Sequence, residues 1–164
     1  MKKIALLFSM LFVLAFANQV KAQAYDKAIG LRFGYPLAAS FKFFVTEPGA
    51  IEIYLGIRSW TWYSSINPGA MYQHHFPISG VDGLSWYVGG GAGLELNNYK
   101  TGYDGDNLGI YINGVLGLDY RFANAPINLS VDWSPTFVLS GGNAYVNDFR
   151  GGYGALSARY ILGE

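Results

Sequence analysis

The chain has no cysteine among its 164 residues. This excludes a disulfide framework, thiol chemistry and a lipobox cysteine that could be acylated. Charged residues are also scarce, at 13% of the chain, whereas aromatic residues make up 17% and there are 22 glycines. Such a composition offers little solvated surface for a soluble protein and is rich in the residues that line membrane interfaces and strand bulges.

Long apolar runs are absent beyond the N-terminus, so no segment of the remaining chain suits a transmembrane helix of roughly 20 residues. The N-terminus itself has the form of an export signal. Lys2 and Lys3 precede the apolar stretch Ile4 to Phe16, and Ala22-Gln23-Ala24 is a small-x-small cleavage motif. Cleavage after Ala17 is an alternative with the same form. We expect residues 1–24 to be a cleaved signal peptide and residues 25–164 to form one domain.

An excess of positive charge is also missing. Removal of the signal would take away three lysines, which leaves eight basic residues against 11 acidic ones. A mature chain with a small negative charge gives no support to nucleic-acid binding.

The most informative stretch is Ile127 to Leu139, in which every odd position is apolar and nearly every even position is small or polar. A strand sends successive side chains to opposite faces, so one face of this segment is apolar and the other polar. Thirteen residues are too many for an ordinary globular strand but suit a tilted strand that crosses a bilayer, which needs about 9 to 11 residues.

Seven further segments show related patterns: Ala28 to Tyr35, Ala39 to Thr46, Ile51 to Tyr63, Ala70 to Ile78, Leu84 to Asn97, Ile110 to Phe122 and Gly152 to Leu162. Glu47-Pro48-Gly49 and Asn67-Pro68-Gly69 between them are predicted turns. We therefore predict an all-β fold, an eight-stranded antiparallel up-and-down transmembrane β-barrel in residues 25–164. Pro135 forfeits a ladder hydrogen bond, so a bulge or a frayed strand end is expected there.

Loop lengths predict the orientation of this barrel. With both termini in the periplasm, the connections near 47–49, 79–83 and 123–126 lie inside, and those near 64–69, 98–108 and 141–151 lie outside. The two longest connections are then external, as in bacterial outer-membrane barrels. Aromatic residues would form two rims, with Tyr35, Trp60, Trp62 and Tyr63 at the outer one and Phe76, Trp86, Tyr120, Phe122 and Tyr160 at the inner one.

Four segments carry a resemblance to a known group: Ile29-Gly30-Leu31-Arg32, residues 80–87, residues 127–133, and the closing Gly154-Ala155-Leu156-Ser157-Ala158-Arg159-Tyr160. Across nearly the whole mature chain, the sequence resembles the small outer-membrane β-barrel proteins common in Bacteroidetes. The resemblance implies an OmpA/OmpX-like barrel in the outer membrane and supplies no catalytic motif. The ending departs from the usual terminal aromatic residue, because Leu162-Gly163-Glu164 follows Tyr160.

Charged residues on the polar faces are predicted to point into the barrel. They are Arg32, Lys42, Glu52, Arg58, Glu95, Asp119, Arg121, Asp132 and Arg159. The interior of an eight-stranded barrel is just wide enough for side chains, and buried charges persist when paired, so we expect these residues to plug the lumen. An ion pathway is the alternative.

Two other groups of residues could carry catalysis or metal binding, but each also has a simpler structural explanation. His74 and His75, with Ser64, Ser65 or Ser79, contain residue types of a lipid A hydrolase or acyltransferase, but they would lie in the periplasmic half. We favour one rim histidine and one interior hydrogen-bonding histidine. Asp104-Gly105-Asp106-Asn107 has hard oxygen ligands for calcium but lacks the later glutamate of an EF-hand loop, and a solvated loop is favoured. The run Gly89-Gly90-Gly91-Ala92-Gly93 resembles a phosphate-binding loop only superficially, because no helix follows it, and its glycines are expected to relieve crowding where a strand bends in the barrel.

The leading functional hypothesis is a non-enzymatic outer-membrane barrel, a monomer without cofactors, whose outer loops contact partners. Its expected partners are outer-membrane lipid, lipopolysaccharide and the barrel assembly machinery. The candidate loop contacts are Tyr99, Lys100, Tyr103, Asp104, Asp106, Asn143, Tyr145, Asp148 and Arg150. The alternatives are a lipid A-modifying barrel enzyme and a secreted lipocalin-like carrier, which requires a polar exterior and an apolar cavity.

Overall fold

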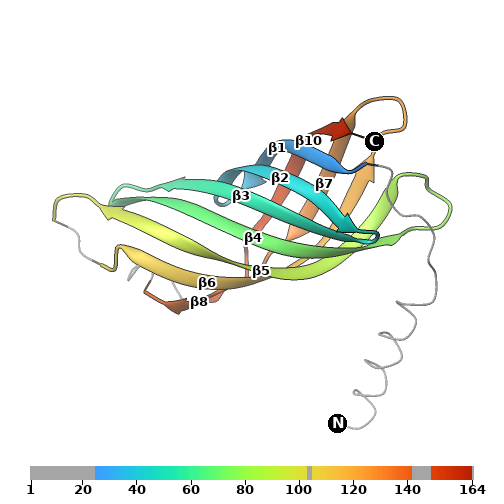
Figure 1. Ribbon diagram of the computed structural model, residues 1–164. Coiled ribbons are helices and arrows are strands. Elements are labelled where there is room, and N and C mark those ends of the chain that lie inside the picture. Colours follow the sequence, from blue (N-terminus) through green and yellow to red (C-terminus); the bar gives the residue numbers. More distant parts are fainter. Residues whose placement is uncertain (1–24, 103–104, 142–148, 164) are drawn as a thin grey trace, which may run out of the picture.

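The computed structural model describes residues 25–102, 105–141 and 149–163, and these residues form strands joined by connections of modest length (Figure 1). The strands are β1 (Lys27–Gly34), β2 (Leu37–Thr46), β3 (Gly49–Ser59), β4 (Tyr63–Pro77), β5 (Leu84–Tyr99), β6 (Leu108–Arg121), β7 (Ile127–Trp133), β8 (Thr136–Ser140), β9 (Phe149–Arg150) and β10 (Gly154–Gly163). Within the described ranges, no helix is both long and apolar enough to span a membrane.

The strands close into an antiparallel barrel. Each of β1 to β6 pairs with its neighbour along the chain, and β10 pairs with β1 on one side and β7 on the other. Strands β7 and β8 both pair with β6 and together form the seventh of eight staves. The eighth stave consists of β9, which pairs with β8, and β10, which pairs with β7. The predicted eight-stranded antiparallel barrel is therefore confirmed.

Pro135 separates β7 from β8. The paired positions Leu116 with Trp133 and Asn113 with Thr136 keep the same register across the gap, so no residue is inserted at the proline. Of the two outcomes expected at Pro135, a bulge is not found there, whereas the strand does end: β7 stops at Trp133 and β8 begins at Thr136. The register shift lies further along, between Ile110 and Tyr111.

The predicted turn at Asn67-Pro68-Gly69 is also wrong, because β4 runs through it and the chain reverses at residues 60–62 instead. Pro68 pairs with Leu55 of β3, whereas Asn67 and Pro68 have no paired position on β5. Proline lacks an N–H group, so it marks a local gap in one ladder as readily as it marks a turn.

The two ends of the barrel differ. Tyr25 and Gly163 lie at one end, here called the terminal end, together with the β2–β3, β4–β5 and β6–β7 connections (Figure 1). The β1–β2, β3–β4 and β5–β6 connections lie at the opposite, distal end. Because β4, β5 and β6 have 14 to 16 residues and β1 has eight, the wall is much taller on one side.

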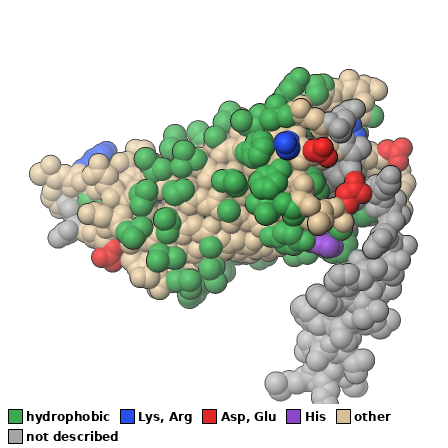
Figure 2. Space-filling view, in the orientation of Figure 1, with side chains coloured by type: hydrophobic (Ala, Val, Ile, Leu, Met, Phe, Trp, Pro, Cys, Tyr) green, Lys and Arg blue, Asp and Glu red, His purple; other side chains and the backbone are tan. Residues whose placement is uncertain are grey.

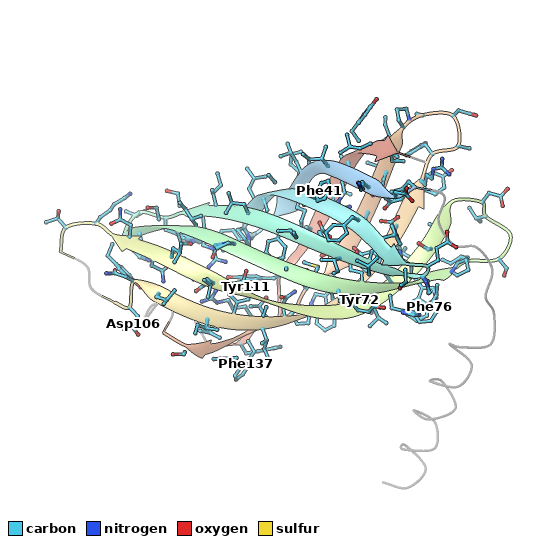
Figure 3. The ribbon with its side chains drawn as sticks, in the orientation of Figure 1. Phe41, Tyr72, Phe76, Asp106, Tyr111 and Phe137 are labelled. Carbon is cyan, nitrogen blue, oxygen red and sulfur yellow. The ribbon has the colours of Figure 1, made fainter. Side chains whose placement is uncertain are left out.

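Side-chain polarity is reversed relative to a soluble protein. Residues 127–133 alternate strictly between exposed apolar and buried polar side chains, as predicted. Ile57, Leu139 and Leu156 are each more than half exposed, whereas Glu52, Lys42 and Asp119 are fully buried. Apolar side chains cover the middle of the barrel surface and charged ones gather toward its ends (Figure 2). Phe137 illustrates this, since its ring points away from the barrel (Figure 3).

Candidate functional site in the barrel interior

Ionised side chains from distant strands meet inside the barrel in two groups. The central network comprises Arg32, Lys42, Glu52, Asp119, Asp132 and Arg159. The distal cluster comprises Arg58, Glu95 and Arg150. Tyr54 and Tyr111 lie between the two groups, with their hydroxyl oxygens 3.1 Å apart. Strand alternation brings all these side chains inward, because each occupies the polar face of its strand.

Glu52 is the centre of the central network. Its carboxylate accepts hydrogen bonds from Arg32 at 3.1 Å, from Gln73 at 2.6 Å and from Arg159. Arg32 also bonds Asp132 at 2.9 Å, which in turn accepts a hydrogen bond from the Tyr87 hydroxyl at 3.0 Å. Every carboxylate in this part of the lumen thus has charged and neutral donors, which is the condition for burying ions without a large penalty.

Lys42 and Asp119 form a separate pair within the same network. The ammonium nitrogen lies 2.9 Å from the carboxylate, and both side chains are fully buried. Asn128 donates a second hydrogen bond to Asp119 at 2.7 Å. The ammonium also lies 5.0 Å from the centroid of the Tyr87 ring, within the range of a cation–π contact.

The distal cluster has two arginines on one carboxylate. Arg58 lies 3.3 Å from Glu95, and Arg150 bonds both oxygens of Glu95, one of them at 3.1 Å. Tyr35 and Tyr153 cover Arg58, with ring centroids 4.5 Å and 5.3 Å from its guanidinium carbon.

Eight of the nine residues predicted to point into the lumen are buried there. Arg121, the ninth, is only half-buried at the end of β6, where its backbone N–H donates to Gly83. Arg150 was predicted as a loop contact, and this was wrong because its side chain is 5% exposed and pairs with Glu95. The only sequence signal for this inward position was the alternation of apolar Phe149 with charged Arg150. Two residues beside a glycine-rich loop are too few to predict a strand.

The remaining loop candidates fall into three groups. Tyr99 ends β5 with its ring 6.1 Å from that of Tyr63, and the Lys100 ammonium donates to the Trp60 carbonyl at 3.1 Å. Asp106 is exposed at the distal end of the barrel (Figure 3). Tyr103, Asp104, Asn143, Tyr145 and Asp148 lie outside the described residues.

The two histidines face opposite ways, as predicted. His75 is fully buried and its Nδ1 lies 3.1 Å from the Ser85 hydroxyl, whereas His74 lies near the Tyr72 hydroxyl at the outer surface. Asp119 pairs with Ser85 in the ladder, so the residue types of a hydrolase triad occur together. All three side chains are buried, however, and the Asp119 carboxylate is bonded to Lys42 and Asn128. This geometry leaves no place for a substrate carbonyl beside the serine, so the set supports packing rather than hydrolysis.

In the described part of the chain, no group of three or more histidine, aspartate or glutamate side chains is placed to hold a metal ion. The candidate calcium segment is described only in part, because Asp104 lies outside the described residues.

No protein-family model matches the chain, and comparisons with curated proteins and with solved structures gave no match. Functional inference therefore depends on the chemistry of the barrel itself.

Proposed function

We propose that this protein is a non-enzymatic β-barrel of a Gram-negative outer membrane, with a structural or surface-interaction role exerted through its distal loops. The observation that carries the proposal is the reversed polarity of the barrel. A continuous exposed apolar surface is costly in water and favourable in lipid, whereas a lumen of paired charges is stable only if the wall around it is closed.

The dimensions agree with this assignment. Six of the eight staves include a strand of ten residues or more, and a tilted strand needs about 9 to 11 residues to cross the hydrocarbon core. Aromatic pairs occur toward both ends, with Trp60 stacked on Trp62 at the distal end and Phe76 stacked on Trp86 at the terminal end. Such pairs suit the two membrane–water interfaces.

The expected orientation puts the terminal end in the periplasm and the distal end outside the cell. The predicted signal peptide and the resemblance to Bacteroidetes outer-membrane barrels support export to this membrane. The partners we propose are outer-membrane lipid, lipopolysaccharide and the barrel assembly machinery, and the protein acts as a monomer.

Neither alternative function gains support from the interior. A lipocalin-like carrier needs an apolar cavity, and this lumen is filled with ionised side chains. A lipid A-modifying enzyme needs an accessible nucleophile at the outer rim, whereas Ser85 and His75 are buried toward the terminal end.

The test is surface labelling of tagged protein in its native bacterium or a Gram-negative host. An epitope tag between Gly105 and Asn107 is expected to bind antibody on intact cells, and a tag at Pro48 only after the outer membrane is permeabilised. Both tagged proteins are expected in the outer-membrane fraction and to migrate faster on gels without boiling. Recovery as soluble periplasmic protein would refute the membrane assignment, and labelling of the Pro48 tag on intact cells would invert the orientation.

A further inference from the structure

The charges inside the barrel are balanced in one half and unbalanced in the other. In the central network, Arg32, Lys42 and Arg159 face three carboxylates, those of Glu52, Asp119 and Asp132. In the distal cluster, two arginines share Glu95, so the described residues leave one positive charge without a counterion. Arg58 and Arg150 are each 5% exposed, and an uncompensated charge at that depth strongly attracts an anion.

The neighbouring phenols do not supply the missing negative charge. Tyr35 and Tyr153 lie in the turns beside the cluster, and their rings contact Arg58. Burial raises the pKa of both phenols, so they remain neutral at physiological pH although Arg58 opposes the shift. Their ring faces stabilise the guanidinium only in part.

A cavity of about 50 Å³ lies against this cluster, lined by Arg58, Glu95, Arg150, Asn67 and Asn113 among others. At 10 to 15 Å³ for each water position, the space holds about three or four waters or one small polar group. It is too small for a sugar or a nucleotide.

Polar atoms in the cavity wall still have hydrogen-bonding capacity. Among the described residues, the Nε atoms of Arg58 and Arg150 and the Oδ1 atoms of Asn67 and Asn113 are buried and have no partner. The arginine N–H groups require an acceptor, and the amide oxygens require a donor. A hydrogen phosphate group has both, since it carries anionic oxygens and a hydroxyl.

We propose that the distal cavity is a binding site for phosphate, either free hydrogen phosphate or the phosphate monoester of a lipid, held between Arg58 and Arg150. The anion supplies the missing charge, and its hydroxyl donates to Asn67 or Asn113. This site is separate from the proposed membrane role, so a failure to bind phosphate would leave the membrane assignment standing.

The test uses the mature chain refolded in an uncharged detergent, with folding checked by migration without boiling. Inorganic phosphate is titrated by calorimetry, with chloride at equal ionic strength as the reference. We expect saturable binding that Arg150→Gln weakens by about tenfold or more, because it removes one charge and leaves Arg58 and Glu95 as a neutral pair. Glu95→Gln should act in the opposite direction and tighten binding.

A second arm separates the two sources of phosphate. Dodecyl phosphate added to the micelles presents the same group on an acyl chain, so tighter binding of this probe than of inorganic phosphate identifies a lipid headgroup as the ligand. Arg121→Gln is the control, since this half-buried arginine does not line the cavity, and binding should be unchanged. No binding of either probe, or equal binding by wild type, Arg150→Gln and Glu95→Gln, would overturn the proposal. Should Arg150→Gln fail to fold, the direction of the Glu95→Gln effect decides.

Discussion

At the residue scale, the contacts of Lys42 and Asp119 show how this barrel keeps ions in its interior. The two groups lie 2.9 Å apart with fully buried side chains, on strands β2 and β6 that are not neighbours in the barrel. Their bond therefore crosses the lumen and joins opposite walls. Removing one partner leaves an uncompensated charge in a low-dielectric interior, whereas removing both does not.

The first prediction follows from this pair. Asp119→Asn should lower the free energy of unfolding of the detergent-folded barrel by about 3–5 kcal/mol, because the lysine charge loses its only ion-pair partner in the central network. The double variant Lys42→Met with Asp119→Asn should lose much less. Urea unfolding followed by gel migration measures both, and Asp106→Asn at the exposed distal end is the control. Equal small effects from Asp119→Asn and Asp106→Asn would indicate a hydrated lumen with independent charges.

At the element scale, β4 shows why a turn motif can lie inside a strand. A Cβ atom on Gly69 would lie 2.5 Å from the Tyr54 ring and 2.9 Å from the Tyr111 hydroxyl. Glycine at this position therefore makes room for the tyrosine layer between the two charged groups. The same residue that favours a turn in the sequence is required here for a close side-chain approach.

The second prediction tests this packing. Gly69→Ala should destabilise the barrel by about 1–3 kcal/mol through overpacking against Tyr54, and Tyr54→Leu should restore part of the loss in the double variant. Gly152→Ala is the control, since a Cβ atom there meets nothing within 4 Å. Thermal unfolding of the wild type, the two single variants, the double variant and the Gly152→Ala control gives the comparison. A Gly69→Ala effect that Tyr54→Leu leaves unchanged would contradict the steric explanation.

At the scale of the whole molecule, buried side chains occupy the interior along the described part of the barrel. A small apolar cluster that includes Tyr25, Ala28 and Ile161 fills the terminal end, followed by the central network and the tyrosine layer. Beyond this layer lies the distal cavity of about 50 Å³, which has room for only a few water positions.

The third prediction is that the folded monomer forms no stable open pore in a planar bilayer. The physical reason is that ion pairs and tyrosine rings fill the bore of an eight-stranded barrel. Single-channel recording at increasing voltage is the measurement, and a larger outer-membrane porin is the positive control. Steady ohmic conductance from purified folded monomer would disprove the plug.

Strand-level features of this protein were accessible from sequence alone. Period-two alternation depends only on the geometry of a strand. Across the eight segments it correctly predicted the apolar outer face of residues 127–133, the inward position of eight of the nine chosen charges and the order of eight staves, but it missed Arg150. Turn motifs were less reliable, because proline and glycine have the same local preferences in the turn at residues 46–49 and beside the ladder gap at residues 67–68.

The partners of each interior charge were decided only by the tertiary structure. The sequence shows that residues 119 and 150 are an aspartate and an arginine, but it does not show their partners. Barrel closure and strand stagger bring Asp119 to Lys42, 77 residues away in the chain, and Arg150 to Glu95, 55 residues away. Ion pairing across a lumen depends on the register of several strands at once, and no single segment contains that information. The described residues of the two halves differ in charge balance, and this difference, from which the phosphate site is inferred, therefore emerges only when the barrel closes.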